Sequence, residues 1–168
     1  MKKTMMMFLL LSFAKLMFAQ SIGTDADKYR QFDFWLGKWE VYKFGTNMHV
    51  GESHIQSVAD SMALLENYNA LGSAYKGKSL NKYNPKSGKW EQFWVDNSGL
   101  SLYLSGSFSN GSMILDDVGN EAGNKEYNRI VWKKTDNNTV RQTWSVSAEA
   151  GESWDVVFDG EYRRKKEK

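Results

Sequence analysis

After Gly37 the sequence is a succession of short segments in which apolar and polar residues alternate, and turn residues separate the segments. Alternation with a period of two is typical of β-strands that bury one face, and no stretch beyond Gly37 repeats with the period of a helix. The chain has one proline, and Asn110-Gly111 is a dipeptide that favours a tight hairpin turn. We therefore expect about eight to ten short strands.

The expected fold is an all-β, antiparallel up-and-down β-barrel of about 8–10 strands, with a short N-terminal helix that closes one end. Consecutive strands joined by short turns pair as antiparallel neighbours, and closure of the sheet removes the exposed edges that attract other strands. A two-sheet sandwich is the structural alternative, because it also accommodates short strands of this kind.

The helix is expected in and just before the aromatic stretch FDFWLGKWEVY, residues 32–42. Aromatic residues recur every three positions at Tyr29, Phe32 and Trp35, with Leu36 next to the last of them. This spacing places them on one face of a helix of two or three turns. Asp25 or Asp27 can cap its start, and Gly37 can end it in a left-handed conformation. We expect Trp39 to seal the floor of the barrel from inside.

Residues 1–19 have the features of a secretory signal peptide. Lys2 and Lys3 precede an apolar run from Met5 to Leu11, and Phe18-Ala19 provides a cleavage site. The run is shorter than the roughly 18 to 20 residues that a membrane-spanning helix needs. We therefore expect an exported protein, periplasmic or secreted, with no stable membrane anchor and with one barrel domain over residues 20–168.

Charge and cysteine content narrow the classes of protein. Without the three lysines of the leader, 19 basic residues face 20 acidic ones, so the formal net charge changes from +2 to −1. The remaining cations are scattered apart from the C-terminal tail, so no nucleic-acid partner is expected. The chain has no cysteine, and its core must therefore be stable without disulfides. A closed barrel hides its strand edges, so a monomer is expected.

Tryptophan-rich faces on four of the expected strands give the main indication of function. Residues two apart in a strand share a face. The shared faces contain Trp90, Gln92 and Trp94, then Trp132, then Gln142 and Trp144, and finally Trp154 and Phe158. If these faces point inward, they line an aromatic pocket in which Gln92 and Gln142 orient a polar group of a ligand. The same residues also suit a packed barrel core, and the pattern does not decide between the two.

Few residues are candidates for catalysis or metal binding. His49 and His54 are expected on opposite faces of one strand, so they cannot converge on a metal ion. Glu52 and His54 share a face and form an alternative acid–base pair. The sequence has no cysteine nucleophile, no G-x-S-x-G and no H-E-x-x-H. We expect no catalytic residue, no metal and no cofactor.

Two loops contain further motifs. The segment from Asp116 to Glu126 is rich in oxygen ligands for Ca²⁺, but its spacing matches no EF-hand and a solvated loop is the simpler interpretation. Residues 147–154, SAEAGESW, resemble an Asp-box turn with Glu149 and Ser153 in place of the usual Asp and Thr. This resemblance indicates a hairpin and no chemistry.

Gly37-Lys38-Trp39, after the expected helix, resembles the start of the calycins, the superfamily of lipocalins, fatty-acid-binding proteins and nitrobindin-like barrels. The segments FDFWLGKWEV, GKSLNKYNPKSGKWEQFWVD and WDVVFDGEYRR together are similar to a group of small exported bacterial proteins of unknown function near that superfamily. The resemblance implies an up-and-down barrel with an apolar ligand. The chain lacks the lipocalin disulfides and a nitrobindin-type histidine, so heme is not expected.

The resemblance also implies how the barrel closes. In lipocalins an arginine near the end of the barrel packs across the tryptophan of the first strand, and Arg163 or Arg164 occupies a comparable place here. The residues expected to close the barrel are Trp35, Gly37, Trp39 and Arg163.

The expected function is the binding of a small hydrophobic or amphipathic molecule inside the barrel, without catalysis. One alternative is a small acid–base enzyme built in the same barrel. Another is a filled barrel that acts through a protein partner. An open or a filled interior distinguishes the binding function from the last of these.

Overall fold

The computed structural model describes residues 27–118, 126–149 and 151–166. The signal peptide predicted for residues 1–19 and the helix cap predicted at Asp25 lie outside the described residues. Residues 27–30 are the described part of an N-terminal unit that ends at Arg30, and in it the backbone N–H of Arg30 donates to the carbonyl oxygen of Asp27 at 3.1 Å. The barrel belongs to the second unit, which begins at Gln31.

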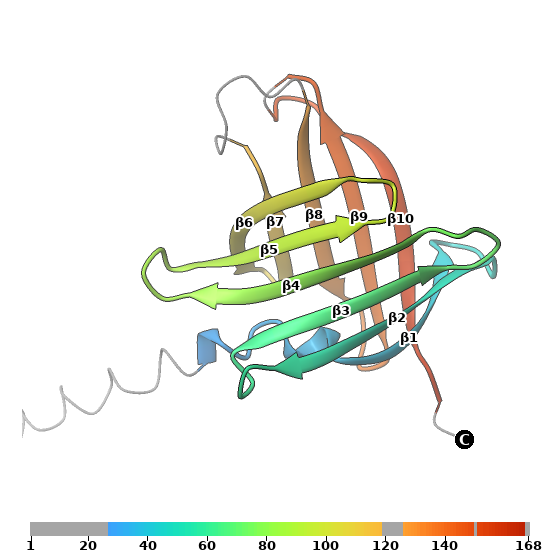
Figure 1. The fold of residues 1–168 in the computed structure, drawn as a ribbon, viewed down its shortest axis with the longest axis horizontal. Coiled ribbons are helices and arrows are strands. Elements are labelled where there is room, and N and C mark those ends of the chain that lie inside the picture. Colours follow the sequence, from blue (N-terminus) through green and yellow to red (C-terminus); the bar gives the residue numbers. More distant parts are fainter. Residues whose placement is uncertain (1–26, 119–125, 150, 167–168) are drawn as a thin grey trace, which may run out of the picture. The chain divides into compact units, whose positions relative to one another are not determined.

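Ten antiparallel strands make up most of the described chain (Figure 1). They are β1 (Gly37–Lys43), β2 (His49–Val58), β3 (Ala63–Ala70), β4 (Lys76–Asn84), β5 (Lys89–Asp96), β6 (Ser101–Ser109), β7 (Ser112–Asp116), β8 (Tyr127–Lys134), β9 (Thr139–Ser147) and β10 (Asp155–Arg164). Burial follows the alternation of the sequence, since every second residue of β4 from Gly77 to Tyr83 is buried.

The strands close into one barrel. Each strand pairs with its neighbours in sequence, and β1 also pairs with β10 in a ladder that runs from Trp39 opposite Arg164 to Lys43 opposite Gly160. The described part of the chain is thus an all-β, antiparallel up-and-down barrel, as predicted. Closure excludes the two-sheet sandwich, because the barrel leaves none of the ten described strands as an edge.

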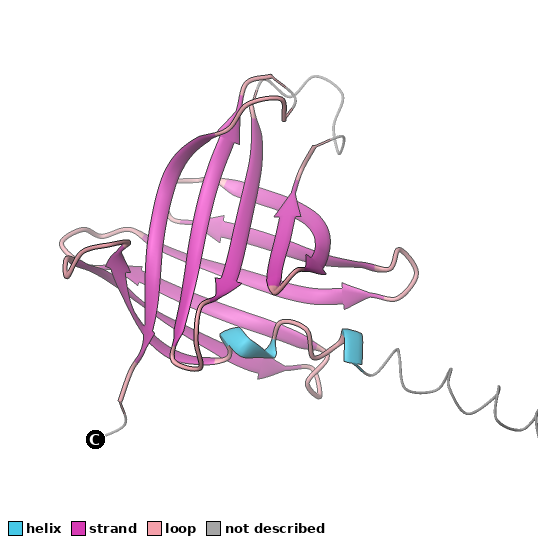
Figure 2. Cartoon of the chain, turned by 180° about the vertical axis from the view of Figure 1, so that it is seen from behind, coloured by secondary structure: helices cyan, strands magenta, loops and turns pink. Residues whose placement is uncertain are grey.

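The predicted helix of two or three turns is wrong. At one end of the barrel the chain forms a single turn of 3-10 helix, η1 (Asp33–Trp35) (Figure 2). A spacing of three residues also matches the 3-10 helix, in which residues i and i+3 eclipse each other. The rings of Phe32 and Trp35 use this geometry and stack with their centroids 5.0 Å apart.

In the described ranges, no helix has the length and apolar character needed to cross a membrane.

An aromatic cluster of Phe32, Trp35, Trp90 and Trp132 fills this end of the barrel. Phe32 is fully buried, and its ring centroid lies 5.6 Å from that of Trp90 and 5.1 Å from that of Trp132 in edge-to-face geometry. Buried Trp39 joins the cluster, since its indole N–H donates to the carbonyl oxygen of Trp35 at 2.8 Å. The cluster forms here because β1 and β5 begin at this end and β8 ends at it.

Arg164 packs across Trp39 from the end of the last strand. Its guanidinium carbon lies 4.3 Å from the ring centroid of Trp39, and its Nη1 donates to the carbonyl oxygen of Leu36 at 3.0 Å. Gly37 leaves room for this group, since a Cβ at its position would collide with Nη1 of Arg164. Gly37 also has a φ of 123°, which side chains of L-residues rarely tolerate.

Arg163, which was predicted to close the barrel, lies on the opposite face of the sheet. In the ladder Arg164 is opposite Trp39, so the two share a face, whereas Arg163 is opposite Glu40. The guanidinium carbon of Arg163 lies 4.1 Å from the ring centroid of Tyr42 on the outer surface. Strand parity therefore assigns the contact with the tryptophan to Arg164 and corrects the prediction of Arg163.

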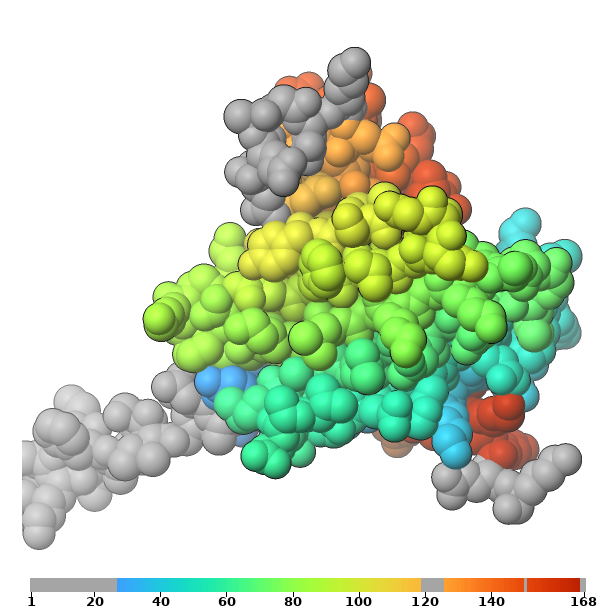
Figure 3. Space-filling model, viewed as in Figure 1, coloured from blue at the N-terminus to red at the C-terminus, as the bar shows by residue number. Residues whose placement is uncertain are grey.

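The outer face of β3 to β6 forms a continuous surface (Figure 3). Leu80, Phe93 and Tyr103 lie opposite one another in a row across β4, β5 and β6. Each of the three is about half exposed, and the side chain of Phe93 is 52% exposed. These apolar side chains contribute little to the core.

Phe32→Ala tests the importance of the aromatic cluster for stability. We expect a loss of about 3–5 kcal/mol in the free energy of unfolding, because the change removes a fully buried ring and leaves a cavity. Phe93→Ala is the matched control and should cost less than about 1 kcal/mol. Urea denaturation followed by tryptophan fluorescence measures both. Equal losses for the two variants would show that the cluster does not stabilise this end.

Candidate functional site

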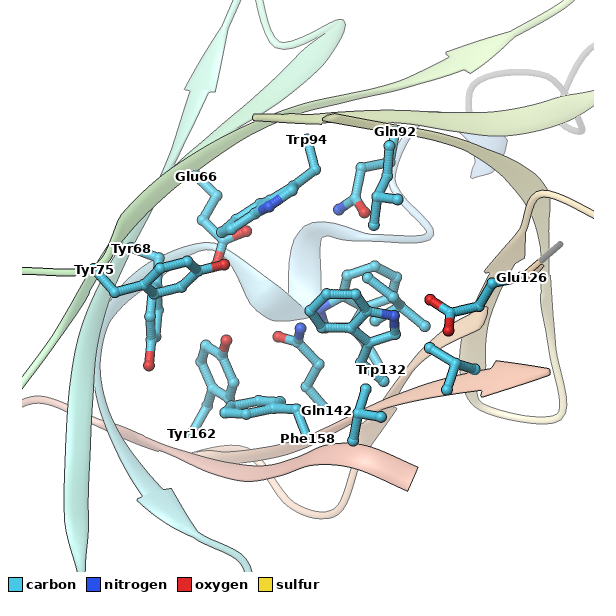
Figure 4. A pocket seen from close by; sticks show the side chains of 15 residues that line it. Glu66, Tyr68, Tyr75, Gln92, Trp94, Glu126, Trp132, Gln142, Phe158 and Tyr162 are labelled. Carbon is cyan, nitrogen blue, oxygen red and sulfur yellow. The ribbon is translucent and has the colours of Figure 1, made fainter. Parts of the chain in front are cut away.

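Beyond the aromatic cluster, the barrel interior holds a cavity of about 460 Å³ (Figure 4). Its wall is mainly aromatic and aliphatic, with a few polar groups, as is usual for sites that bind small molecules. The lining residues are Glu66, Tyr68, Tyr75, Gln92, Trp94, Leu102, Glu126, Ile130, Trp132, Gln142, Trp144, Val146, Val157, Phe158 and Tyr162.

Six of the eight residues predicted to line a pocket surround this cavity. They are Gln92, Trp94, Trp132, Gln142, Trp144 and Phe158. Three different strands, β5, β8 and β9, carry five of these residues on regular alternating faces. The alternation brings them together because all three strands present the same parity to the barrel interior.

Trp90 does not line the cavity. It is buried at the start of β5 within the aromatic cluster, and its indole N–H donates to Oε1 of Gln31 at 3.2 Å. Its ring centroid lies 6.2 Å from that of Tyr83. Trp90 has the parity predicted for it, but it lies at the packed end of the barrel.

Trp154 also lies away from the cavity, in the turn between β9 and β10. Its indole N–H donates to the carbonyl oxygen of Gly151 at 3.0 Å, and the guanidinium of Arg129 packs 4.1 Å from its ring centroid. The pairing of β10 with β9 shifts between Val156 and Phe158. This β-bulge inserts one residue and breaks the parity on which the prediction for Trp154 relied.

The turn of residues 147–154 has the hairpin role indicated by its likeness to an Asp-box. The hydroxyl oxygen of Ser147 accepts hydrogen bonds from the backbone N–H groups of Glu149 and Gly151, at 3.2 and 3.0 Å. The hydroxyl of Ser153 donates to Oε2 of Glu149 at 2.7 Å. These bonds hold the described residues of the turn by local contacts, and residue 150 lies outside the described residues.

Glycines on the inner faces of three strands make room for cavity aromatics. A Cβ at Gly77 would collide with the ring of Trp94, and a Cβ at Gly160 would approach Cζ of Phe158 to 2.6 Å. A Cβ at Gly51 would lie 2.6 Å from the hydroxyl oxygen of Tyr68. Aromatic rings can therefore lie flat along the wall instead of filling the centre of the barrel.

A chain of hydrogen bonds crosses the wall from β5 to β2 and converges on Glu66. Nε2 of Gln92 donates to Oδ1 of Asn81 at 2.8 Å, and Nδ2 of Asn81 donates to the hydroxyl oxygen of Ser79 at 2.9 Å. The hydroxyls of Ser79 and Ser53 donate to the two carboxylate oxygens of Glu66, each at 2.9 Å. Asn81 lies opposite Gln92, and Ser79 lies opposite Glu66, so strand register builds this chain.

Glu66 is the buried acid of the cavity, with only 2% of its surface exposed. Burial raises the pKa of Glu66 to about 7, although hydrogen bonds from Ser53 and Ser79 oppose the shift. Sequence reasoning missed this residue. The alternation of Leu64, Glu66 and Tyr68 on one face of β3 would have placed it inside the barrel.

Three tyrosines accompany Glu66 on one side of the cavity (Figure 4). Burial, followed by the charge of Glu66, raises the pKa of both Tyr68 and Tyr162. Burial and a hydrogen bond to Asp96 raise the pKa of Tyr75. All three phenols are therefore neutral near pH 7 and offer O–H groups and ring faces.

Asp96 anchors two of the aromatic side chains at the end of β5. Its Oδ2 accepts from the hydroxyl of Tyr75 at 2.9 Å and from the indole N–H of Trp94 at 3.1 Å. Burial alone would raise the pKa of Asp96, but hydrogen bonds from Ser98, Tyr75 and Trp94 outweigh it and lower the pKa to about 2. Asp96 therefore remains ionised and holds both rings at the wall.

Three polar atoms of the cavity residues have no hydrogen-bond partner among the described residues. They are Oε1 of Gln92, Oε1 of Gln142 and Nε1 of Trp132. A buried polar group without a partner costs about 1–3 kcal/mol. Native proteins contain few such groups, and a ligand that supplies the missing partners is one physical explanation for them.

The alternative acid–base pair lies outside the barrel. Glu52 and His54 are opposite Glu40 and Lys38 on the outer face, and Oε1 of Glu52 accepts from Nζ of Lys165 at 2.7 Å. A register shift between Val41 and Tyr42 places His49 opposite Tyr42, so His49 lies on the same outer face as His54 and not on the opposite face, as was predicted. Neither histidine contributes to the cavity.

Metal binding finds no support in the described residues, among which no group of three or more His, Cys, Asp or Glu side chains can hold an ion. Asp116 pairs with Arg129 at 2.8 Å, and Asp117 accepts from the backbone N–H of Asn128. Residues 119–125 of the predicted oxygen-rich loop lie outside the described residues.

Comparison with known proteins assigns no family to the chain. No protein-family model matches the sequence, and no curated protein matches it significantly.

Glu66→Gln tests the cost of the buried carboxyl. In the unfolded chain this group ionises near its ordinary pKa of 4.5, and in the folded barrel near 7. Between these values the folded state binds more protons, so the stability of the wild type falls as pH rises. We expect Glu66→Gln to gain roughly 3 kcal/mol over the wild type from about pH 4.5 to about pH 7.5.

Chemical denaturation at several pH values measures this difference. Glu52→Gln is the matched control on the outer surface, where loss of an exposed ion pair should change stability by less than about 1 kcal/mol. If Glu66→Gln and the wild type respond to pH identically, the carboxyl does not titrate in this window.

Proposed function

We propose that this chain is an exported barrel of the calycin type that binds a small hydrophobic or amphipathic molecule in its cavity. The observation that carries this proposal is the combination of a cavity of about 460 Å³ with three polar atoms in a largely aromatic wall that find no hydrogen-bond partner in the described part of the chain. A filled barrel acting only through its surface does not need either feature.

The size and chemistry of the cavity support a small organic ligand. Sites for such ligands measure roughly 300–1,000 Å³ and combine apolar walls with a small number of polar groups that fix orientation. The amides of Gln92 and Gln142 and the indole N–H of Trp132 are suited to that orienting role. The aromatic rings supply apolar contact area and ring faces.

The closure of the barrel supports the calycin assignment. The arginine that lipocalins pack across the first-strand tryptophan has a counterpart in Arg164, whose guanidinium carbon lies 4.3 Å from the ring centroid of Trp39. The up-and-down order of the strands agrees with the same assignment. Export is proposed on the leader-like composition of residues 1–19.

Val146→Trp tests binding by filling the cavity. Val146 lies on the inner face of β9, so an indole at this position occupies ligand space. We expect the affinity for the neutral probe N-phenyl-1-naphthylamine to fall at least about tenfold, because the probe loses apolar contact area. Probe fluorescence, which rises in apolar surroundings, measures the affinity.

Val95→Trp is the matched control, because Val95 is exposed on the outer face of β5. It should bind the probe as the wild type does. Native mass spectrometry of the protein purified from its own host then searches for the natural ligand. A wild-type barrel that takes up neither the probe nor any host molecule contradicts the binding function.

A second candidate is an acid–base enzyme built in the same cavity. The observation in its favour is the Glu66 carboxyl, which lines the cavity with a pKa raised to about 7 by burial. In this case Glu66→Gln abolishes turnover of a substrate while ligands still bind. Binding that proceeds without chemical change of the bound molecule favours the first candidate.

A further inference from the structure

The ionisable carboxyl groups of the described cavity wall are not balanced by basic side chains. Among the described residues that line the cavity, Glu66 and Glu126 are acidic and none is basic. Two of the strands that line the cavity, β8 and β9, carry arginines that point outward. There Arg129 of β8 pairs with Asp116, and Arg141 of β9 pairs with Asp159. The described lining therefore contains one buried carboxyl group, that of Glu66, and one exposed carboxyl group, that of Glu126, without a cationic counterpart.

The wall surrounding Glu66 is suited to a positive charge. Tyr68, Tyr75, Trp94 and Tyr162 line the cavity on the side of Glu66 (Figure 4). The face of an aromatic ring carries a negative quadrupole and attracts ammonium groups, most strongly where water is excluded. An aromatic wall thus adds attraction for a cation to the apolar contacts that it offers to any ligand.

Each carboxylate oxygen of Glu66 has capacity for one more hydrogen bond. Each of its two oxygens accepts one hydroxyl hydrogen bond, at 2.9 Å, and a carboxylate oxygen has two lone pairs. No basic side chain of the described residues pairs with it. A buried carboxylate is stabilised strongly when a cation pairs with it and fills the remaining lone pairs.

We propose that the cavity selects organic cations, in particular amphipathic amines, with Glu66 as the counterion of the ammonium group and the aromatic wall around its apolar body. This inference rests on the proposed binding function and names the chemical class of its ligand. Gln92 and Gln142 contribute acceptors for further N–H or O–H groups of the same molecule. A carboxylate ligand is disfavoured, because it would meet Glu66 without a neutralising charge.

The groups that face Glu66 determine the pH dependence of amine binding. Ser53 of β2 and Ser79 of β4 are hydroxyls that do not titrate, and burial keeps Tyr68 and Tyr162 neutral by raising the pKa of each phenol. Tyr75 is neutral for the same reason, and Asp96 stays ionised because its pKa is lowered to about 2. Among these groups, Glu66, with a pKa of about 7, is therefore the one that changes charge near neutral pH.

Three probes with the same aromatic body and different charges test the proposal. They are 1-naphthylmethylamine, 1-naphthalenemethanol and 1-naphthoate, and isothermal titration calorimetry of the full chain at about pH 7.5 measures each affinity. We expect the amine to bind roughly 10-fold to 100-fold more tightly than the alcohol, because a charged hydrogen bond adds to the shared apolar contacts. The carboxylate should bind most weakly.

Two further measurements connect the preference to Glu66. Glu66→Gln keeps a hydrogen-bonding side chain of the same shape and should bring the amine to the affinity of the alcohol, whereas Glu52→Gln on the outer surface should keep the preference. In the wild type, amine affinity should fall about tenfold from pH 7.5 to about pH 5.5, as Glu66 gains a proton, and alcohol affinity should not change. The pH series needs no variant and therefore tests the proposal even if Glu66→Gln does not fold.

The outcomes separate the inference from the function on which it rests. Equal binding of amine and alcohol, tighter binding of the carboxylate, or an amine preference that persists in folded Glu66→Gln would overturn the charge preference and leave the binding function standing. An amine affinity independent of pH would overturn it as well. If none of the three probes binds and N-phenyl-1-naphthylamine is also excluded, the binding function itself fails.

Discussion

The packing of Phe32 against Trp35, Trp90 and Trp132 is the contact on which the rest of the structure depends. Ten described strands enclose a wider interior than eight, and inward side chains alone fill it less completely. The aromatic cluster fills one end and leaves the other hollow. Trp132 belongs to both regions, since its ring centroid lies 5.1 Å from that of Phe32 and its side chain also lines the cavity. The floor of the cavity is therefore a part of the packed core.

Glu66 shows that the interior is not optimised for stability. A buried carboxyl whose pKa is raised to about 7 makes the folded state less stable at neutral pH than an uncharged residue of the same shape would. The hydroxyls of Ser53 and Ser79 offset only part of this cost. Groups that oppose folding in this way are concentrated at functional sites, and this one lies in the wall of a ligand-sized cavity.

The regular parts of the barrel could be predicted from the sequence, because alternation alone determines which side chains face inward. Gln92, Trp94, Gln142 and Trp144 lie where a period of two places them. The prediction that Trp154 lines the pocket was wrong, because the bulge between Val156 and Phe158 changes which residues face inward. No residue pattern in the sequence indicates this bulge.

Other features of the closure and the site needed the structure for different reasons. A spacing of three is common to α-helices with an apolar face and to the 3-10 turn, so Phe32 and Trp35 predicted a helix longer than η1. Arg163 and Arg164 are neighbours, and only the register of β1 with β10 decides between them. The alternation of β3 would have placed Glu66 inside the barrel. Its hydrogen bonds with Ser53 and Ser79 could not be predicted in the same way, because they depend on how β3 pairs with β2 and β4.

The chain of hydrogen bonds makes the two polar parts of the cavity physically dependent on each other. Gln92 donates to Asn81, Asn81 donates to Ser79, and Ser79 donates to Glu66, so every donor in this series points toward the carboxylate. Hydrogen bonds aligned in one direction polarise one another and strengthen together. A ligand group that donates to the unpartnered Oε1 of Gln92 would extend the series from its far end and favour the ionised form of Glu66. Recognition of a polar group at Gln92 and of a cation at Glu66 would then be cooperative, with the wall of β4 transmitting the effect between them.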